Sequence, residues 1–208
     1  MHNLADKLAA GLGSLDCILD VPTQERLLEY LDLLAKWNKA YNLTAVRDKE
    51  QMLTRHILES LTLIPYIYGT HILDVGTGAG VPGIPLAIVF PDKNFYLVDS
   101  NSKKTRFLNQ VKIELKLSNV SVFHERVESL DFPFQMDQIL SRAFADVATT
   151  VKLLDDLWSS HTVLSLMKGP GVNEELAMIP QNMDINVIEL KAPEQTEFRC
   201  LAELKHRI

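Results

Sequence analysis

A glycine-rich stretch in the first half of the chain contains the pattern that most clearly indicates a ligand-binding site. Residues 72–83 read Ile-Leu-Asp-Val-Gly-Thr-Gly-Ala-Gly-Val-Pro-Gly, an apolar run that leads into glycines and a proline. This order is typical of a strand, a tight turn and a helix N-terminus, because glycine adopts positive φ and proline fits a first helical turn. Without Cβ atoms, Gly76, Gly78 and Gly80 let a ligand approach the main chain. The stretch predicts a nucleotide-binding turn, and its plain alternative is a turn without a ligand.

Two carboxylates narrow the class of ligand. Asp99 ends the next apolar run, 23 positions after Gly76, where an acidic side chain can accept both hydroxyls of an adenosine ribose. S-adenosylmethionine and NAD share that ribose. Asp74, two residues before Gly76, would repel a pyrophosphate, whereas it favours a sulfonium and an ammonium. We therefore favour S-adenosylmethionine and expect Asp74 to orient its ammonium group; for Asp99, an N-cap of the following helix is the alternative.

Composition limits the class of protein. The chain has 208 residues, of which 47% are hydrophobic and 23% charged, as in globular proteins that bury a sizeable core. Its net charge is −6, so contact with a nucleic acid would require a local basic patch. Cys17 and Cys200 fit neither a disulfide framework nor a metal site, so no metal is expected. The first residues do not resemble a signal peptide, and no apolar run approaches the roughly 18 residues of a membrane span, so a cytoplasmic protein is expected.

The pattern of elements predicts a helical extension followed by an α/β core. Residues 1–68 contain helical periodicity only, with predicted helices at 4–18, from about 23 to the polar stretch 36–44, and from about 49 to 64. From residue 69 to 208, predicted strands at 71–75, 95–99, 119–124, 137–141, 161–167, 185–191 and 198–205 alternate with helices at 82–90, 102–117, 146–158 and 173–179.

This alternation predicts a fold class. Strands that alternate with helices form a largely parallel sheet, as in Rossmann-like folds. The last two strands are joined by only residues 192–197, which is too short for a parallel crossover, so the final strand should be antiparallel. A seven-stranded, mostly parallel sheet with a final antiparallel strand is the layout of Rossmann-like S-adenosylmethionine-dependent methyltransferases. Dehydrogenase sheets are usually all parallel, which favours the methyl donor a second time.

Seven segments, in order along the chain, carry a resemblance to a known family. The segments are 36–44 (Lys-Trp-Asn-Lys-Ala-Tyr-Asn-Leu-Thr), 55–60 (Arg-His-Ile-Leu-Glu-Ser), 74–85, 97–100, 126–128 (Arg-Val-Glu), 141–145 (Ser-Arg-Ala-Phe-Ala) and 167–169 (Met-Lys-Gly). In these segments the sequence closely resembles the RsmG or GidB (glucose-inhibited division protein B) family of bacterial 16S ribosomal RNA methyltransferases. The resemblance thins after residue 170, although Arg199 matches an arginine in the family's last strand. It implies transfer of a methyl group from S-adenosyl-L-methionine to the N(7) atom of a specific guanine near the decoding site.

The resemblance also implies site residues. Family positions that contact the methyl donor fall on Val81, Val127, Glu128 and Arg142, in addition to the three glycines and Asp99. For Val81, core packing is an equal alternative, and for Glu128 the alternative is a solvated carboxylate. Arg142 follows the fourth strand, where it could hold the donor's carboxylate, an RNA phosphate or the guanine oxygen, or else form a structural salt bridge. Phe144 could stack on the guanine or pack in the core.

The expected chemistry requires no general base, because N(7) of a neutral guanine carries a lone pair and no proton. RNA contacts are expected from basic residues near the ligand end of the sheet, foremost Lys103, Lys104 and Lys168, each of which could equally be a solvated charge. The expected partner is 16S rRNA within the small subunit or an assembly intermediate, and the protein is expected to be a monomer. The alternatives are a small-molecule methyltransferase, a nicotinamide-dependent oxidoreductase, and a module that binds the methyl donor without turnover.

Overall fold

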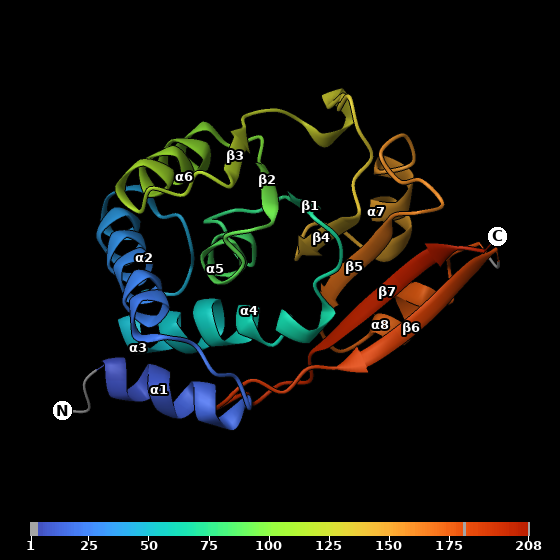
Figure 1. The fold of residues 1–208 in the computed structure, drawn as a ribbon. Coiled ribbons are helices and arrows are strands. Elements are labelled where there is room, and N and C mark those ends of the chain that lie inside the picture. The colour runs from blue at the N-terminus through green and yellow to red at the C-terminus, as the bar shows by residue number, and fades with distance from the viewer. Residues whose placement is uncertain (1–3, 181, 208) are drawn as a thin grey trace.

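A seven-stranded sheet forms the centre of the molecule (Figure 1). The computed structural model describes residues 4–180 and 182–207. The strand order is β3-β2-β1-β4-β5-β7-β6. The strands are β1 (His71–Val75), β2 (Asn94–Val98), β3 (Val120–Phe123), β4 (Gln138–Arg142), β5 (Val163–Lys168), β6 (Met183–Glu189) and β7 (Cys200–His206). All seven predicted strands are present, and their ends differ from the prediction by a few residues at most.

The directions of the strands confirm the predicted fold class. The strands β1 to β5 pair in parallel with one another. The final strand, β7, lies between β5 and β6 and is antiparallel to both, with Leu166 opposite Ala202 and Val187 opposite the same alanine. The short β6–β7 connection therefore forms the antiparallel hairpin that the sequence predicts.

Helices cover both faces of the sheet, and side chains alternate between them. Ile72 belongs to a core cluster under the N-terminal helices, whereas its neighbour Leu73 belongs to a second cluster on the opposite face. The helices of the core are α5 (Gly83–Val89), α6 (Ser102–Glu114), α7 (Val147–Leu153) and α8 (Val172–Leu176). The predicted span 146–158 was too long, because α7 is capped at Leu154. The acidic residues Asp155 and Asp156 that follow are unfavourable at the negative end of a helix.

The N-terminal helices pack on the same core cluster as α5 and α6. They are α1 (Leu4–Ser14), α2 (Val21–Tyr41), α3 (Lys49–Met52) and α4 (Glu59–Leu61), with a π-helical segment at Leu53–Leu58 and a 3₁₀ turn at Ile64–Tyr66. The single helix predicted over 49–64 thus contains a π-helical segment, a feature that simple periodicity does not reveal and that often occurs at functional sites. Among the described residues, no helix is both long and apolar enough to cross a membrane.

Candidate active site

A cleft of about 430 Å³ opens at the carboxyl ends of β1, β2 and β4. Ligands of open α/β sheets bind at this position, where neighbouring connections lead to opposite faces of the sheet. Four of the residues predicted to bind the methyl donor line the cleft, namely Gly76, Asp99, Val127 and Glu128. The predicted residues Gly78, Gly80, Val81, Asp74 and Arg142 are outside its lining.

The glycine turn has the backbone geometry that its sequence predicts. Gly76, Gly78 and Gly80 have φ values of +65°, +63° and +90°, a region that strains residues with a side chain. A Cβ at Gly76 would lie 2.5 Å from the ring of Phe144, which forms part of the cleft wall. At Gly78, an added Cβ would meet nothing closer than the Lys104 ammonium at 3.8 Å. The turn therefore presents bare main chain beside the cleft.

Asp99 connects the glycine turn to the start of α6. Its Oδ2 accepts a hydrogen bond from the Gly78 N–H at 2.9 Å, and its Oδ1 accepts one from the Asn101 N–H at 2.8 Å. Lys104 lies 3.4 Å from Oδ2. The N-cap alternative for Asp99 is wrong, because α6 is capped by Asn101, whose side chain accepts from the Lys103 N–H. Asp99 thus lines the cleft with a carboxylate whose orientation is fixed by two main-chain groups.

Asp74 is fully buried beneath the glycine turn. Its Oδ2 accepts hydrogen bonds from the Thr77 hydroxyl at 2.6 Å and from the Gly83 N–H at 2.9 Å, while no described residue hydrogen-bonds its Oδ1. Burial raises the pKa of Asp74 to about 7, against the opposing effect of these two hydrogen bonds. A Cβ at Gly83 would lie 2.6 Å from Oδ2, so only glycine lets α5 begin this close to the carboxylate. Asp74 therefore braces the turn from below.

The other predicted residues of the cleft come from the β3–β4 connection and from β1–α5. Val127 and Glu128 begin a 3₁₀ turn (Val127–Ser129); the valine is buried and the glutamate is exposed. Val81 is 9% exposed and packs away from the lining. Opposite them, Ala143 has a φ of +52°, an uncommon conformation for a residue with a Cβ, and it lies in the cleft wall beside Phe144.

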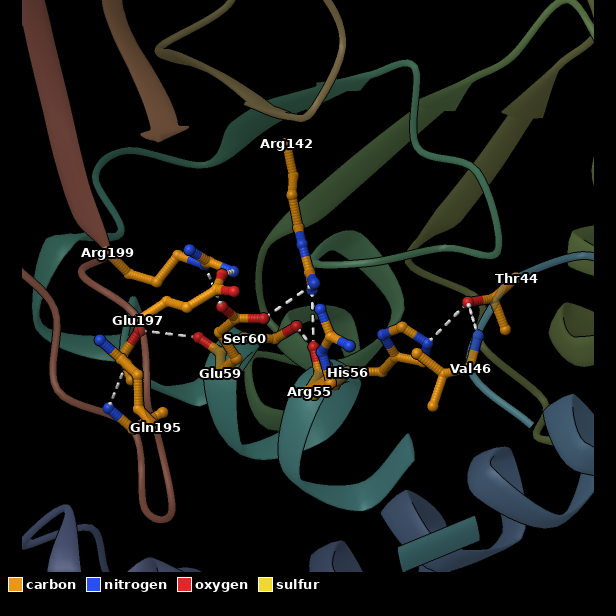
Figure 2. Close-up of polar contacts among 12 residues, drawn as sticks. Thr44, Val46, Arg55, His56, Glu59, Ser60, Arg142, Gln195, Glu197 and Arg199 are labelled. Atoms are coloured by element: carbon orange, nitrogen blue, oxygen red, sulfur yellow. Dashed lines mark hydrogen bonds and ion pairs between the residues drawn. The ribbon is translucent and has the colours of Figure 1, made fainter. Parts of the chain in front are cut away.

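Arg142 points away from the cleft, into a cluster of charged residues on the π-helical segment, the start of α4 and the β6–β7 connection (Figure 2). Its guanidinium is 2.8 Å from Oε2 of Glu59 and donates to the Arg55 carbonyl at 2.8 Å. The other oxygen of Glu59 accepts from Nε of Arg199 at 3.1 Å. Glu59 is only 7% exposed, so one buried carboxylate joins β4 to the start of β7. The salt bridge that the sequence left open for Arg142 is present.

The buried residue beside this cluster is His56, also in the π-helical segment. Its Nε2 is 3.0 Å from the Thr44 hydroxyl, and Nδ1 has no hydrogen-bond partner among the described residues. Burial, together with the positive charge of Arg142, lowers the pKa of His56 to about 4. This imidazole is therefore neutral near pH 7 and holds the 42–47 loop in place through Thr44.

The three lysines expected to contact RNA have different surroundings. The Lys168 ammonium donates to the Ala145 carbonyl at 2.6 Å and pairs with Glu175 at 2.7 Å. Lys104 lies over Asp99, as described above, at the rim of the cleft. Lys103 is exposed on the first turn of α6, and its side chain forms no ion pair with the described acids.

Comparison with known proteins identifies the family. The profile of the GidB family, described as rRNA small subunit methyltransferase G, matches residues 23–200. The chain belongs to this family. A relative named ribosomal RNA small subunit methyltransferase G from Pseudomonas aeruginosa (strain UCBPP-PA14) is 50% identical over 182 residues, covering 87% of this chain and 85% of its own. The protein of the same name from Laribacter hongkongensis (strain HLHK9) is 45% identical over 203 residues, covering 97% and 98%.

Solved structures agree with the fold. The magnesium protoporphyrin IX methyltransferase from Synechocystis PCC 6803, solved with bound SAM, has a TM-score of 0.57 at 15% identity and covers 90% of this chain and 98% of its own. An rRNA methylase from Streptococcus thermophilus has a TM-score of 0.52 at 14% identity, covering 72% and 94%. At these identities the likeness concerns the Rossmann-like methyltransferase fold alone.

The cleft fits the S-adenosylmethionine that the family uses. One side consists of glycine main chain that a Cβ would obstruct, and the other carries the Asp99 carboxylate at the end of β2. The Oδ1 of Asp74, which no described residue hydrogen-bonds, lies beneath the turn, where a cationic ligand would favour the ionised carboxylate and a diphosphate would disfavour it.

Sequence reasoning missed Glu59 and Thr77. Glu59 lies in the family segment 55–60, and an acid in the apolar run Ile57-Leu58-Glu59-Ser60-Leu61 signals a buried charge that needs a partner. Thr77 stands between two glycines at a position that the glycine pattern leaves unspecified, so nothing local indicates its bond to Asp74.

Proposed function

We propose that this chain transfers the methyl group of S-adenosyl-L-methionine to the N(7) atom of a specific guanine in 16S rRNA. Membership of the GidB family and the cleft between bare glycine main chain and Asp99 support the proposal, and the cleft is the observation that carries it. The methyltransferase family leaves the nicotinamide-dependent alternative without support. The partner we propose is the small ribosomal subunit or an assembly intermediate. We also propose that the protein acts in the cytoplasm as a monomer.

In this proposal the residues of the cleft bind and orient the methyl donor. Asp99 accepts the ribose hydroxyls, and Gly76, Gly78 and Gly80 supply close main-chain contact. Val127 and Glu128 lie where an adenine would rest against the 3₁₀ turn. Asp74 attracts the ammonium through its free oxygen or through water, and Val81 supports the turn from the core.

Catalysis in this proposal consists of alignment rather than proton transfer. When bound, the methyl donor would supply an electrophilic methyl group, which would pass to the unprotonated lone pair of N(7) as its bond to the sulfonium sulfur breaks and S-adenosylhomocysteine is left. The chain then has to hold the reacting atoms in line at roughly 3–3.5 Å and to exclude water. Phe144 and Ala143 form a wall for this purpose, which Lys168 holds through the Ala145 carbonyl. In this scheme Arg142 positions the neighbouring Ala143 of the wall, because the Arg142 guanidinium is held by Glu59.

The two regions 1–68 and 69–208 have separate roles in this proposal. The second binds the methyl donor, and the first packs on it as a helical extension at the rim of the cleft. Tyr30 of α2 donates a hydrogen bond to the Ala79 carbonyl at 2.7 Å, which places the extension directly against the glycine turn.

The decisive experiment is transfer of labelled methyl to purified small subunits, followed by mapping of the modified nucleotide. We expect one N(7)-methylguanine in 16S rRNA with the wild type and a loss of at least tenfold in kcat/KM with Asp99→Asn, because a neutral amide accepts fewer hydrogen bonds from the ribose. Label in small molecules but not in subunits would favour the small-molecule alternative. Binding of the methyl donor without any transfer would favour the binding-module alternative.

A further inference from the structure

Two segments of the chain carry lysine and arginine without any acid. Residues 33–47 and 100–113 together contain seven of the 21 Lys and Arg residues and none of the 27 Asp and Glu residues. The rest of the chain therefore has 14 cations against 27 acids. The cations of the chain are thus concentrated in two acid-free segments, and the fold decides whether these segments form one surface.

The fold places these two segments side by side. The first covers the end of α2 and the following loop, and the second covers most of α6, which is the neighbour of α2 in the structure (Figure 1). The Trp37 ring of α2 lies 5.7 Å from the Phe107 ring of α6. At the other end, Arg26 near the start of α2 donates to the Leu115 carbonyl after α6 at 2.8 Å. The two helices therefore run antiparallel, and the end of α2 lies beside the start of α6.

That shared end lies at the rim of the cleft. The helix α6 begins directly after Asp99, and Lys104 in its first turn contacts that carboxylate. The loop after α2 is held rigidly, because the buried side chain of Asn38 donates to the Val46 carbonyl at 2.9 Å and accepts from the Thr44 N–H at 2.8 Å. A ligand on this surface would thus meet a preformed site next to the methyl donor.

We name Lys36, Tyr41, Lys103 and Arg106 the basic ridge. All four are exposed, and none of the three cations forms an ion pair with the acids that the structure describes. The Tyr41 ring is 46% exposed and lies 5.1 Å from the Trp37 ring, which supports it from beneath. Free cations beside an exposed, supported aromatic ring are the combination that binds single-stranded nucleic acid, because phosphates pair with the charges while an unpaired base stacks on the ring.

We propose that the basic ridge binds a single-stranded segment of rRNA that flanks the target guanine, with one base on Tyr41 and phosphates on the three cations. The proposal rests on the proposed function and goes beyond it, since it places the RNA on the helical extension and α6 rather than on Lys168 or Arg199. Those two cations are already paired with Glu175 and with Glu59 and Glu197.

The test compares two triple variants of equal charge. Lys36→Gln/Lys103→Gln/Arg106→Gln removes the cations of the ridge, and Lys116→Gln/Lys152→Gln/Lys205→Gln removes three exposed cations elsewhere. Binding to small subunits and to protein-free 16S rRNA is measured between 50 and 200 mM salt, and S-adenosylhomocysteine binding is measured by calorimetry as a check on the fold. Between roughly 50 and 200 mM salt, the affinity of a protein that contacts phosphates falls measurably because counterions are released on binding.

For the ridge variant we expect rRNA affinity to fall about tenfold or more and the slope of log K against log salt to flatten by about 2, since each single-strand phosphate contact contributes roughly 0.7. The control variant should lose less than threefold by the same reasoning, and both should bind S-adenosylhomocysteine like the wild type. Tyr41→Ala should weaken binding at least fivefold without changing the slope, and Tyr41→Phe should restore it.

Equal affinities and slopes for the ridge and control variants would overturn the proposal. So would a loss on intact subunits without a loss on protein-free rRNA, because the ridge would then contact a ribosomal protein. Failure of the wild type to methylate subunits would contradict the proposed function alone, because the binding measurements judge the ridge without any methyl transfer.

Discussion

Replacement of Glu59 by glutamine tests whether the buried carboxylate holds the wall of the cleft. In the native structure each oxygen of Glu59 serves one arginine, Arg142 at 2.8 Å and Arg199 at 3.1 Å. Glutamine has nearly the same shape, but it is neutral, and its amide nitrogen would face a guanidinium donor with another donor. The variant therefore removes one hydrogen bond and the negative charge while it leaves the packing almost unchanged.

The expected cost follows from the exposure of the partners. Removal of one member of a fully buried ion pair costs about 3–5 kcal/mol, because the other charge stays buried without compensation. Here the side chains of Arg142 and Arg199 are 22% and 23% exposed, and Arg199 retains Glu197. Solvent therefore screens part of the loss, and we expect Glu59→Gln to lower the free energy of unfolding by about 2–3 kcal/mol. In a domain of this size that corresponds to a Tm lower by roughly 4–12 °C.

The assay is urea unfolding, paired with calorimetric binding of S-adenosylhomocysteine. Arg142 is followed directly by Ala143, Phe144 and Ala145 in the cleft wall, so affinity should fall several-fold together with stability. The control is Glu197→Gln, since Glu197 pairs with Arg199 at 2.8 Å but its side chain is 65% exposed, and it should cost no more than about 1 kcal/mol. If Glu59→Gln is as stable as Glu197→Gln and binds equally well, the carboxylate has no positioning role.

Three further variants test the buried groups of the site. Burial raises the pKa of Asp74 to about 7 from 3.8, so the stability that its protonated form contributes is present below pH 3.8 and is lost as the pH rises to about 7. In urea titrations Asp74→Asn should therefore gain stability relative to the wild type as the pH rises across this window. A difference in unfolding free energy that does not change with pH would refute the raised pKa. Burial lowers the pKa of His56 to about 4 from 6.5, so the stability that the neutral imidazole contributes is present above pH 6.5 and is lost as the pH falls to about 4. His56→Gln should therefore lose less stability than the wild type on acidification. If both proteins lose unfolding free energy equally between pH 6.5 and about 4, the imidazole is solvated. Gly76→Ala should cost about 1–3 kcal/mol in unfolding free energy and weaken S-adenosylhomocysteine binding, because the residue has a φ of +65° and a Cβ there would lie 2.5 Å from the Phe144 ring. The control is Gly13→Ala, since the space around the Cβ position of Gly13 is open. Equal effects of the two substitutions would contradict the close approach of Phe144 to Gly76.

The sequence predicted the elements that depend on local pattern. Glycines at 76, 78 and 80 specify the turn because other residues are strained at positive φ, and the apolar runs before Asp74 and Asp99 specify two adjacent strands. The short connection before β7 fixed the antiparallel direction of the last strand, since a chain of that length cannot cross the sheet. These features follow from the conformations of short segments, so no distant residue was needed to infer them.

The direction of Arg142 depended on the tertiary structure instead. A guanidinium at the end of β4 can reach the cleft or the helical extension, and the choice was made by Glu59, a buried acid 83 positions earlier in the chain. The π-helical segment that contains His56 and directly precedes Glu59 departs from the 3.6-residue period, so periodicity alone predicted an ordinary helix.

The basic ridge joins both kinds of information. The absence of acids from the two segments can be read from the amino-acid order without any structure. Only the packing of Trp37 against Phe107 decided that the segments lie together at the rim of the cleft, since contact between distant helices depends on burial of both apolar faces at once. Within residues 4–180 and 182–207 the same long-range packing brings acids to Lys168 and Arg199, whereas it brings none into an ion pair with Lys36, Lys103 or Arg106.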